Sequence, residues 1–121
     1  METKHFANIQ PLDQLAVARL GQHELAYSQE ALVLTEVAGE RSFAPVIYFP
    51  ISDCAEKYLQ ASATQTFCPI KGTAHYFSVV IDQEVYKDAA WYYPDPISGV
   101  STIAGYLSFS EKVLSISVAG L

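Results

Sequence analysis

The sequence predicts a single, mainly β domain whose strands pair antiparallel, with one short helix. The chain has 121 residues, of which half are apolar and 17% are charged, so it is long enough for one core and too apolar for a disordered tail. Glycine, proline, asparagine and aspartate interrupt it often, and the short segments between them are rich in Val, Ile, Tyr and Phe. We therefore expect residues 1–121 to form one compact antiparallel β domain of the β-barrel kind.

Side-chain alternation and β-forming composition predict about eight strands in order along the chain. Residues 15–20 alternate in polarity, a turn follows at Gly21, and residues 25–27 return as the partner strand. In residues 31–37 the alternation places Leu32, Leu34 and Glu36 on one face. The remaining strands are expected at residues 46–49, 74–81, 85–86, 89–93, 103–109 and 113–118.

One segment has the features of a helix. Pro50 ends the strand at residues 46–49, and Ser52 and Asp53 offer an N-cap for the helix-forming residues 55–59. This pattern predicts a helix of about two turns. Asp53 is therefore interpreted as a cap or turn residue rather than a catalytic acid.

Charge and hydropathy exclude several classes of partner. Thirteen acidic residues against seven basic ones give a net charge of −6, which disfavours binding to duplex nucleic acid because phosphates require a basic face. Residues 1–8 have no apolar stretch typical of a secretory signal. The longest uncharged stretch, residues 96–110, is mixed in polarity and shorter than the ~20 apolar residues of a membrane span. We expect a soluble cytoplasmic protein without membrane attachment.

The two cysteines do not form a recognisable metal motif. Cys54 and Cys68 lie outside any C-x-x-C pair and are too few for a four-cysteine zinc site, so no metal and no cofactor are expected. In a cytosolic setting two reduced thiols are the expected state, and a disulfide between them is the alternative.

Residues 64–76 form the most unusual stretch, interpreted as a loop that leads into a strand. Pro69 and Gly72 allow a tight bend, with Cys68 and Lys71 on either side of it. A lysine near a thiol can make that thiol a reactive thiolate, so Cys68 is a candidate nucleophile. The alternative is a buried thiol and a solvated lysine on a turn.

Glu36 and Lys71 each stand at the end of an uncharged stretch. A charge beside buried aromatic surface needs a partner, because its desolvation alone is costly. We therefore predict that Glu36 and Lys71 line one wall of the same cavity and pair directly or through one water. Alternatively, Glu36 is only the polar end of its strand.

Aromatic residues gather in the middle of the chain, where Tyr hydroxyls can serve as polar points in a pocket. Tyr48, Tyr76 and Tyr93 are candidate hydrogen-bond donors. Alternation places Trp91 on the same face as Tyr93, where their rings can form a wall for a planar ligand or a corner of the core. His75 lies on a strand and is interpreted either as a general base or as a structural histidine.

Three ordered motifs resemble a known family. They are Tyr48-Phe49-Pro50 followed by Asp53, then Cys68-Pro69-x-Lys71-Gly72-x-Ala74-x-Tyr76, then Ala90-Trp91-x-Tyr93-Pro94-x-Pro96. Together with flanking matches between residues 26 and 109, they are similar to the DUF427 family of small proteins of unknown function. The resemblance implies a β fold close to the Mss4-like or β-tent type and a shared pocket built from the motif residues. His75 and Ser110 depart from the family pattern.

The family also carries a nucleotidyltransferase label, which makes that role a further possibility. The chain lacks the G-S and D-x-D signature of nucleotidyltransferases, and it lacks the two C-x-x-C pairs of zinc-binding Mss4-like proteins. The resemblance therefore assigns neither a nucleotidyltransferase site nor a zinc site to residues of this chain.

Two functional hypotheses follow. In the first, a small-molecule pocket, catalytic or not, is formed by Lys71, Glu36, Cys68, Tyr48, Tyr76, Trp91 and Tyr93. Lys71 and Glu36 supply paired charges, Cys68 a nucleophile or polar wall, the tyrosines hydrogen bonds, and Trp91 a stacking surface. In the second, the same residues belong to a non-catalytic binding or interaction module. An exposed edge strand could pair with the same strand of a second copy, so a homodimer is a possible assembly.

Overall fold

The computed structural model describes residues 5–119 and is built almost entirely from strands. Residues 1–4, which carry part of the segment examined for a secretory signal, lie outside the described range. The strands are β1 (His5–Pro11), β2 (Ala16–Leu20), β3 (His23–Ser28), β4 (Leu32–Ala38), β5 (Arg41–Ser42), β6 (Val46–Pro50), β7 (Leu59–Cys68), β8 (Gly72–Ile81), β9 (Glu84–Tyr92), β10 (Tyr106–Phe109) and β11 (Ser115–Val118). Three 3-10 helices connect them: η1 (Ile51–Asp53), η2 (Glu56–Tyr58) and η3 (Ser98–Ile103). The mainly β prediction is confirmed, and no helix in the described range is long and apolar enough to cross a membrane.

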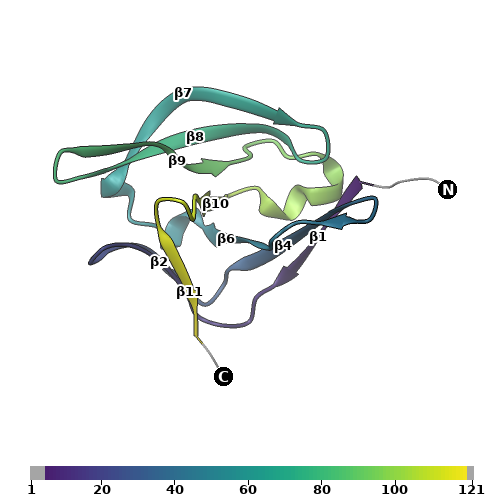
Figure 1. The fold of residues 1–121 in the computed structure, drawn as a ribbon, viewed down its shortest axis with the longest axis horizontal. Coiled ribbons are helices and arrows are strands. Elements are labelled where there is room, and N and C mark those ends of the chain that lie inside the picture. The colour runs from purple at the N-terminus through teal and green to yellow at the C-terminus, as the bar shows by residue number, and fades with distance from the viewer. Residues whose placement is uncertain (1–4, 120–121) are drawn as a thin grey trace.

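The strands form two antiparallel sheets. The larger sheet has the order β1-β4-β6-β10-β9-β8-β7, with β5 paired to β4, and the smaller one has the order β11-β2-β3. The larger sheet folds over itself, so that β7, β8 and β9 lie above β1, β4 and β6, with η3 between the two layers (Figure 1). β1 and β7 are the two edges of this open sheet.

The larger sheet buries apolar residues on both of its faces. Directly paired residues share a face of the sheet. The pair Val33 and Ile47 packs into one hydrophobic cluster, called the first core here, and the pair Leu34 and Val46 packs into another, called the second core. The first core also contains Ala16, Ala18 and Leu25 of the smaller sheet. The second core contains Val100 and Ile103 of η3, together with Leu34, Tyr48, Ala74 and Tyr93. The alternation predicted for residues 31–37 is thus present, because Leu32 and Leu34 face the second core.

The expected helix is short, as predicted, but it is not a continuous two-turn helix. Single 3-10 turns stand at η1 and η2, and no side chain caps either of them, so the N-cap expected from Ser52 and Asp53 does not form. Between the turns Cys54 is extended and bridges to Ala26. The amide of Ala55 donates to the carbonyl of Leu25 at 2.7 Å. Pairing with β3 therefore outweighs the local helix propensity.

Other differences concern polar or irregular strands. Residues 64–68 are part of β7 rather than a loop; this strand lies at a sheet edge and is mostly exposed, so it lacks the apolar alternation that marks half-buried strands. The two strands expected at residues 85–86 and 89–93 are one strand, β9 (Glu84–Tyr92), with an irregularity near Asp88, whose φ is 55°. The strand expected at residues 103–109 begins only at Tyr106, because η3 occupies the segment up to Ile103.

Candidate functional site

The turn between β7 and β8 positions Lys71. The amide of Lys71 donates to the carbonyl of Cys68 at 3.2 Å, and its carbonyl accepts from the amide of Ile97 at 3.0 Å. Gly72 follows with φ +111°, and a Cβ there would lie 3.3 Å from the carbonyl oxygen of Asp95. Only glycine fits this close approach without strain. The turn is thereby fixed against the segment that leads into η3.

Lys71 and Glu36 form the predicted ion pair. Lys71 Nζ lies 3.2 Å from Glu36 Oε1, and only 12% and 19% of the two side chains are exposed. The other carboxylate oxygen of Glu36 lies 2.7 Å from Nε2 of His5. β1 pairs with β4 and brings His5 to this place. Sequence reasoning missed His5, since no feature of the sequence indicates that β1 lies beside β4.

Both partners of Glu36 favour its charged form. Burial is the largest single effect on the pKa of this carboxyl group and acts to raise it. The hydrogen bond from His5 and the charge of Lys71 act in the opposite direction and together lower the pKa below its ordinary value of 4.5. Glu36 is therefore held as a carboxylate at neutral pH.

Tyr48 contributes a buried hydroxyl to the second core, where the charge of Glu36 acts on it. The residue is 1% exposed, and its hydroxyl has no hydrogen-bond partner among the residues that the structure describes. Burial raises its pKa to about 12, and the charges of Cys68 and Glu36 act in the same direction. The indole of Trp91 acts to lower this pKa, although its contact with the hydroxyl does not have the geometry of a regular hydrogen bond. A buried polar group without a partner is costly and calls for an explanation.

The remaining tyrosines complete the polar cluster. Lys71 Nζ lies 5.8 Å from the centre of the Tyr93 ring, within cation–π range. Tyr93 is buried, and its pKa is raised by burial and then by the nearby Tyr48. The hydroxyl of Tyr76 lies 2.9 Å from Oγ1 of Thr66. Cys68, two residues further along β7, shares the face of Thr66.

Most of the residues predicted for the site lie in the second core or contact it. The structure brings together Lys71, Glu36, Cys68, Tyr48, Tyr76, Trp91 and Tyr93. His75 does not join them, since its ring lies against Tyr92, which packs with the first core. The catalytic and ligand-binding roles of the seven residues stay predictions, as does the cavity expected around them.

Two cavities occur away from these residues. One, of about 400 Å³, is lined by Leu20, Gly21, His23, Ile81, Asp82, Glu84 and Tyr86. Another, of about 200 Å³, is lined by Pro11, Asp13, Gln29, Glu30, Ala31, Leu32 and Tyr106. Neither is lined by any of the seven predicted site residues.

Both cysteines are free, so the alternative of a disulfide between them is wrong. Cys54 packs against the first core and donates from its thiol to the carbonyl of Pro50 at 3.4 Å. Burial raises the pKa of this thiol to about 12, which makes Cys54 an inert structural cysteine. Across residues 5–119, no three His, Cys, Asp or Glu side chains are grouped so that they could hold a metal ion.

Comparison with known proteins identifies the family but no characterised relative. No curated protein matches the chain. A family model described as a domain of unknown function matches residues 8–120, which is nearly the whole chain. The matched range contains the segments around Tyr48, Lys71 and Trp91, which the fold brings together at the second core. The chain therefore belongs to the DUF427 family, a domain of unknown function.

Proposed function

We propose that the second-core face around Lys71 binds a small polar molecule with an aromatic or other planar part. The ammonium group of Lys71 and the carboxylate of Glu36 are the charged contacts of this site. The rings of Trp91 and Tyr93 form its apolar wall, and the tyrosine hydroxyls provide directional hydrogen bonds.

The observation that carries this proposal is the buried hydroxyl of Tyr48, which lacks a hydrogen-bond partner within residues 5–119. It belongs to the same core as Tyr93, whose ring Lys71 contacts. A purely structural core has no use for a buried phenol, because phenylalanine fills the same volume without the cost of an unpaired polar group. A ligand group that accepts or donates a hydrogen bond would satisfy this hydroxyl. Glu36 and Lys71, with 19% and 12% of their side chains exposed, are open enough to be reached from solvent.

The same arrangement offers groups for chemistry as well as for binding. Cys68 and Lys71 carry the nucleophilic atoms, and Glu36 is the acid–base group beside them. Catalysis is the second part of this proposal, and it requires that a ligand binds at this site. A nucleotidyltransferase role is the least favoured form, since the single lysine of the site is already paired with Glu36 at 3.2 Å and little positive charge is left for a triphosphate.

The alternative function is a non-catalytic interaction module. It is favoured by the burial of Tyr48 and Tyr93, which are 1% and 5% exposed as core residues are. In that case the pair of Lys71 and Glu36 is a structural brace.

A thermal-shift screen of the purified protein against metabolites, nucleotides included, tests the proposal. A ligand present at 100 times its Kd stabilises the folded protein by about 2.7 kcal/mol. We then expect Tyr48→Phe to leave the free protein at least as stable as the wild type, because it removes an unsatisfied group, and to weaken the ligand-induced shift. Lys71→Met is expected to abolish that shift, while Lys112→Met, at an exposed lysine, preserves it.

Three results would overturn the proposal. A screen without any stabilising compound would favour the interaction module. A marked loss of stability in ligand-free Tyr48→Phe would show that the hydroxyl serves the fold itself. A hit that Tyr48→Phe and Lys71→Met both leave unchanged would place binding at another part of the molecule.

A further inference from the structure

A second candidate site lies at the far end of β8 from Lys71. The cavity of about 400 Å³ is formed where the β2–β3 turn approaches the β8–β9 turn. β8 runs from Gly72, next to Lys71, to Ile81, which lines this cavity. The cavity therefore shares no residue with the second-core site, and a ligand bound here would not contact Lys71.

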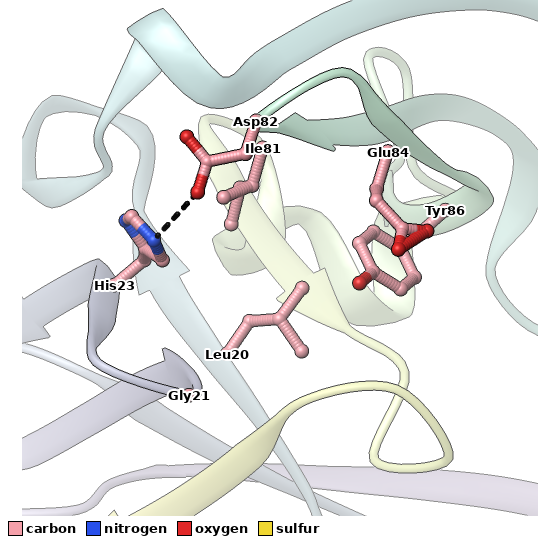
Figure 2. A pocket seen from close by; sticks show the side chains of 7 residues that line it. All are labelled: Leu20, Gly21, His23, Ile81, Asp82, Glu84 and Tyr86. Carbon is pink, nitrogen blue, oxygen red and sulfur yellow. Dashed lines mark ion pairs between the residues drawn. The ribbon is translucent and has the colours of Figure 1, made fainter.

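The cavity has an apolar floor between two carboxylates. Figure 2 shows Leu20 and Ile81 in the middle, Asp82 with His23 on one side, and Glu84 beside the Tyr86 ring on the other. Ile81 is only 7% exposed, so this floor is a fixed part of the first core.

The charge of the cavity is negative. Its lining contains Asp82 and Glu84 but no lysine or arginine. Nε2 of His23 lies 3.6 Å from Oδ2 of Asp82 and forms an ion pair with it when the imidazole is protonated (Figure 2), whereas no ion pair involving Glu84 is found among the described residues. Nδ1 of His23 lies 3.3 Å from the Tyr58 hydroxyl. The Asp82 side chain is 84% exposed and thus keeps its oxygens available to a ligand.

The position of Asp82 is held by an unusual turn. Asp82 and Gln83 both have positive φ, 51° and 71°, as in the two-residue turns that normally contain Asn-Gly. A non-glycine residue with positive φ is strained. The turn nevertheless links the paired residues Ile81 and Glu84. Asp82 is thereby held at the rim of the cavity, above the apolar floor.

From this arrangement we propose that the cavity binds a small organic cation, an aliphatic amine with a hydrocarbon body. The hydrocarbon packs on Leu20 and Ile81, and the ammonium group pairs with Glu84 beside the Tyr86 ring, where cation–π attraction adds to the ion pair. A second ammonium group at the other end of the ligand meets Asp82. Anions are excluded by the two carboxylates and by the protein's net charge of −6.

Titration of the ¹⁵N-labelled full chain followed by NMR tests this assignment. The probes are 1-pentylamine, 1,5-diaminopentane and 1-pentanol, which share a five-carbon chain and carry one, two and no positive charges at neutral pH. We expect saturable shifts at residues 20–23 and 81–86 with both amines, tighter binding of the diamine, and no saturable shift with the alcohol. Raising the salt from 0.05 M to 0.5 M should weaken the binding, because exposed charges are screened. Equal binding of the alcohol and the amines would overturn the assignment, as would shifts confined to other residues.

Variants that each remove one negative charge provide the second part of this test. Asn tolerates positive φ, so Asp82→Asn keeps the turn, and Glu84→Gln keeps the side-chain length. Each is expected to weaken diamine binding about two- to fivefold, the range for partly exposed ion pairs. Glu40→Gln, at an exposed residue outside the cavity lining, removes the same charge and should leave binding unchanged. An equal loss in all three variants would reduce the effect to net charge and refute the site. Because the shifts identify the residues involved, this result is independent of what binds near Lys71.

Discussion

Replacement of Lys71 by methionine measures how strongly the ion pair with Glu36 supports the fold. Lys71 Nζ lies 3.2 Å from Glu36 Oε1 with both side chains mostly buried. Loss of a hydrogen bond to a charged group costs about 1.5–3 kcal/mol. Two features place the expected loss at the low end of this range. Glu36 keeps His5 at 2.7 Å, and the methionine side chain still covers the ring of Tyr93.

We therefore expect Lys71→Met to lower the free energy of unfolding by about 1–2 kcal/mol. For a domain of this size that corresponds to a fall in Tm of roughly 3–10 °C. Trp91 is the protein's one tryptophan and packs with the second core, so its fluorescence reports unfolding at this place directly. Urea unfolding followed by Trp91 fluorescence and by far-UV circular dichroism gives the free energy, provided that the two signals coincide.

A double-mutant cycle with Glu36→Gln isolates the pair. Because the two side chains are in direct contact, we expect a coupling free energy of about 1 kcal/mol. A coupling below about 0.3 kcal/mol, the level of additivity for independent sites, would refute the reasoning. A loss of 3–5 kcal/mol in the single variant would show a fully buried structural pair instead, and it would remove Lys71 from the proposed binding site.

Three further predictions concern the pH dependence and two backbone positions. The folded-state pKa of Glu36 is lowered from 4.5, so its contribution to stability is present above about pH 4.5 and is lost as the pH falls through the folded-state value; the stability difference between wild type and Glu36→Gln should shrink between pH 6 and pH 3 in urea titrations, and a constant difference would contradict this. Gly72 has φ +111°, and a Cβ there would lie 3.3 Å from Asp95 O, so Gly72→Ala should lower the free energy of unfolding by about 2 kcal/mol or more. The control Gly99→Ala, whose Cβ would meet no atom within 4 Å, should stay close to wild type. Equal effects of the two variants would show that the turn is not constrained. Gln83→Gly, at φ 71°, should raise the free energy of unfolding by about 0.5–1 kcal/mol, and a lower melting temperature in calorimetry would contradict the strain assigned to this turn.

Several features of the fold and the site follow from local patterns. The period of two in residues 31–37 predicts that Leu32, Leu34 and Glu36 share a face, and the structure has Leu32 and Leu34 in the second core. The cost of burying an isolated charge predicts a partner for Lys71, and Glu36 is that partner. These inferences succeed because alternation along a strand and the desolvation of a charge depend on the residue and its immediate neighbours.

Other features depend on strands that are distant in the sequence. The helix expected after Ser52 is broken because Cys54 bridges to Ala26, and β7 has too little apolar alternation to be recognised, because an edge strand needs few buried residues.

The sequence by itself thus determined a mainly β fold, the faces of its buried strands and the pairing of two charges. Only the tertiary structure decided that His5 joins Glu36 and that a cavity forms where the β2–β3 and β8–β9 turns meet. It also decided that the Tyr48 hydroxyl finds no partner in the described part of the chain. The physical reason is that hydrogen bonding and burial in a sheet are set by which strands become neighbours, and that order arises from long-range pairing rather than from any local propensity.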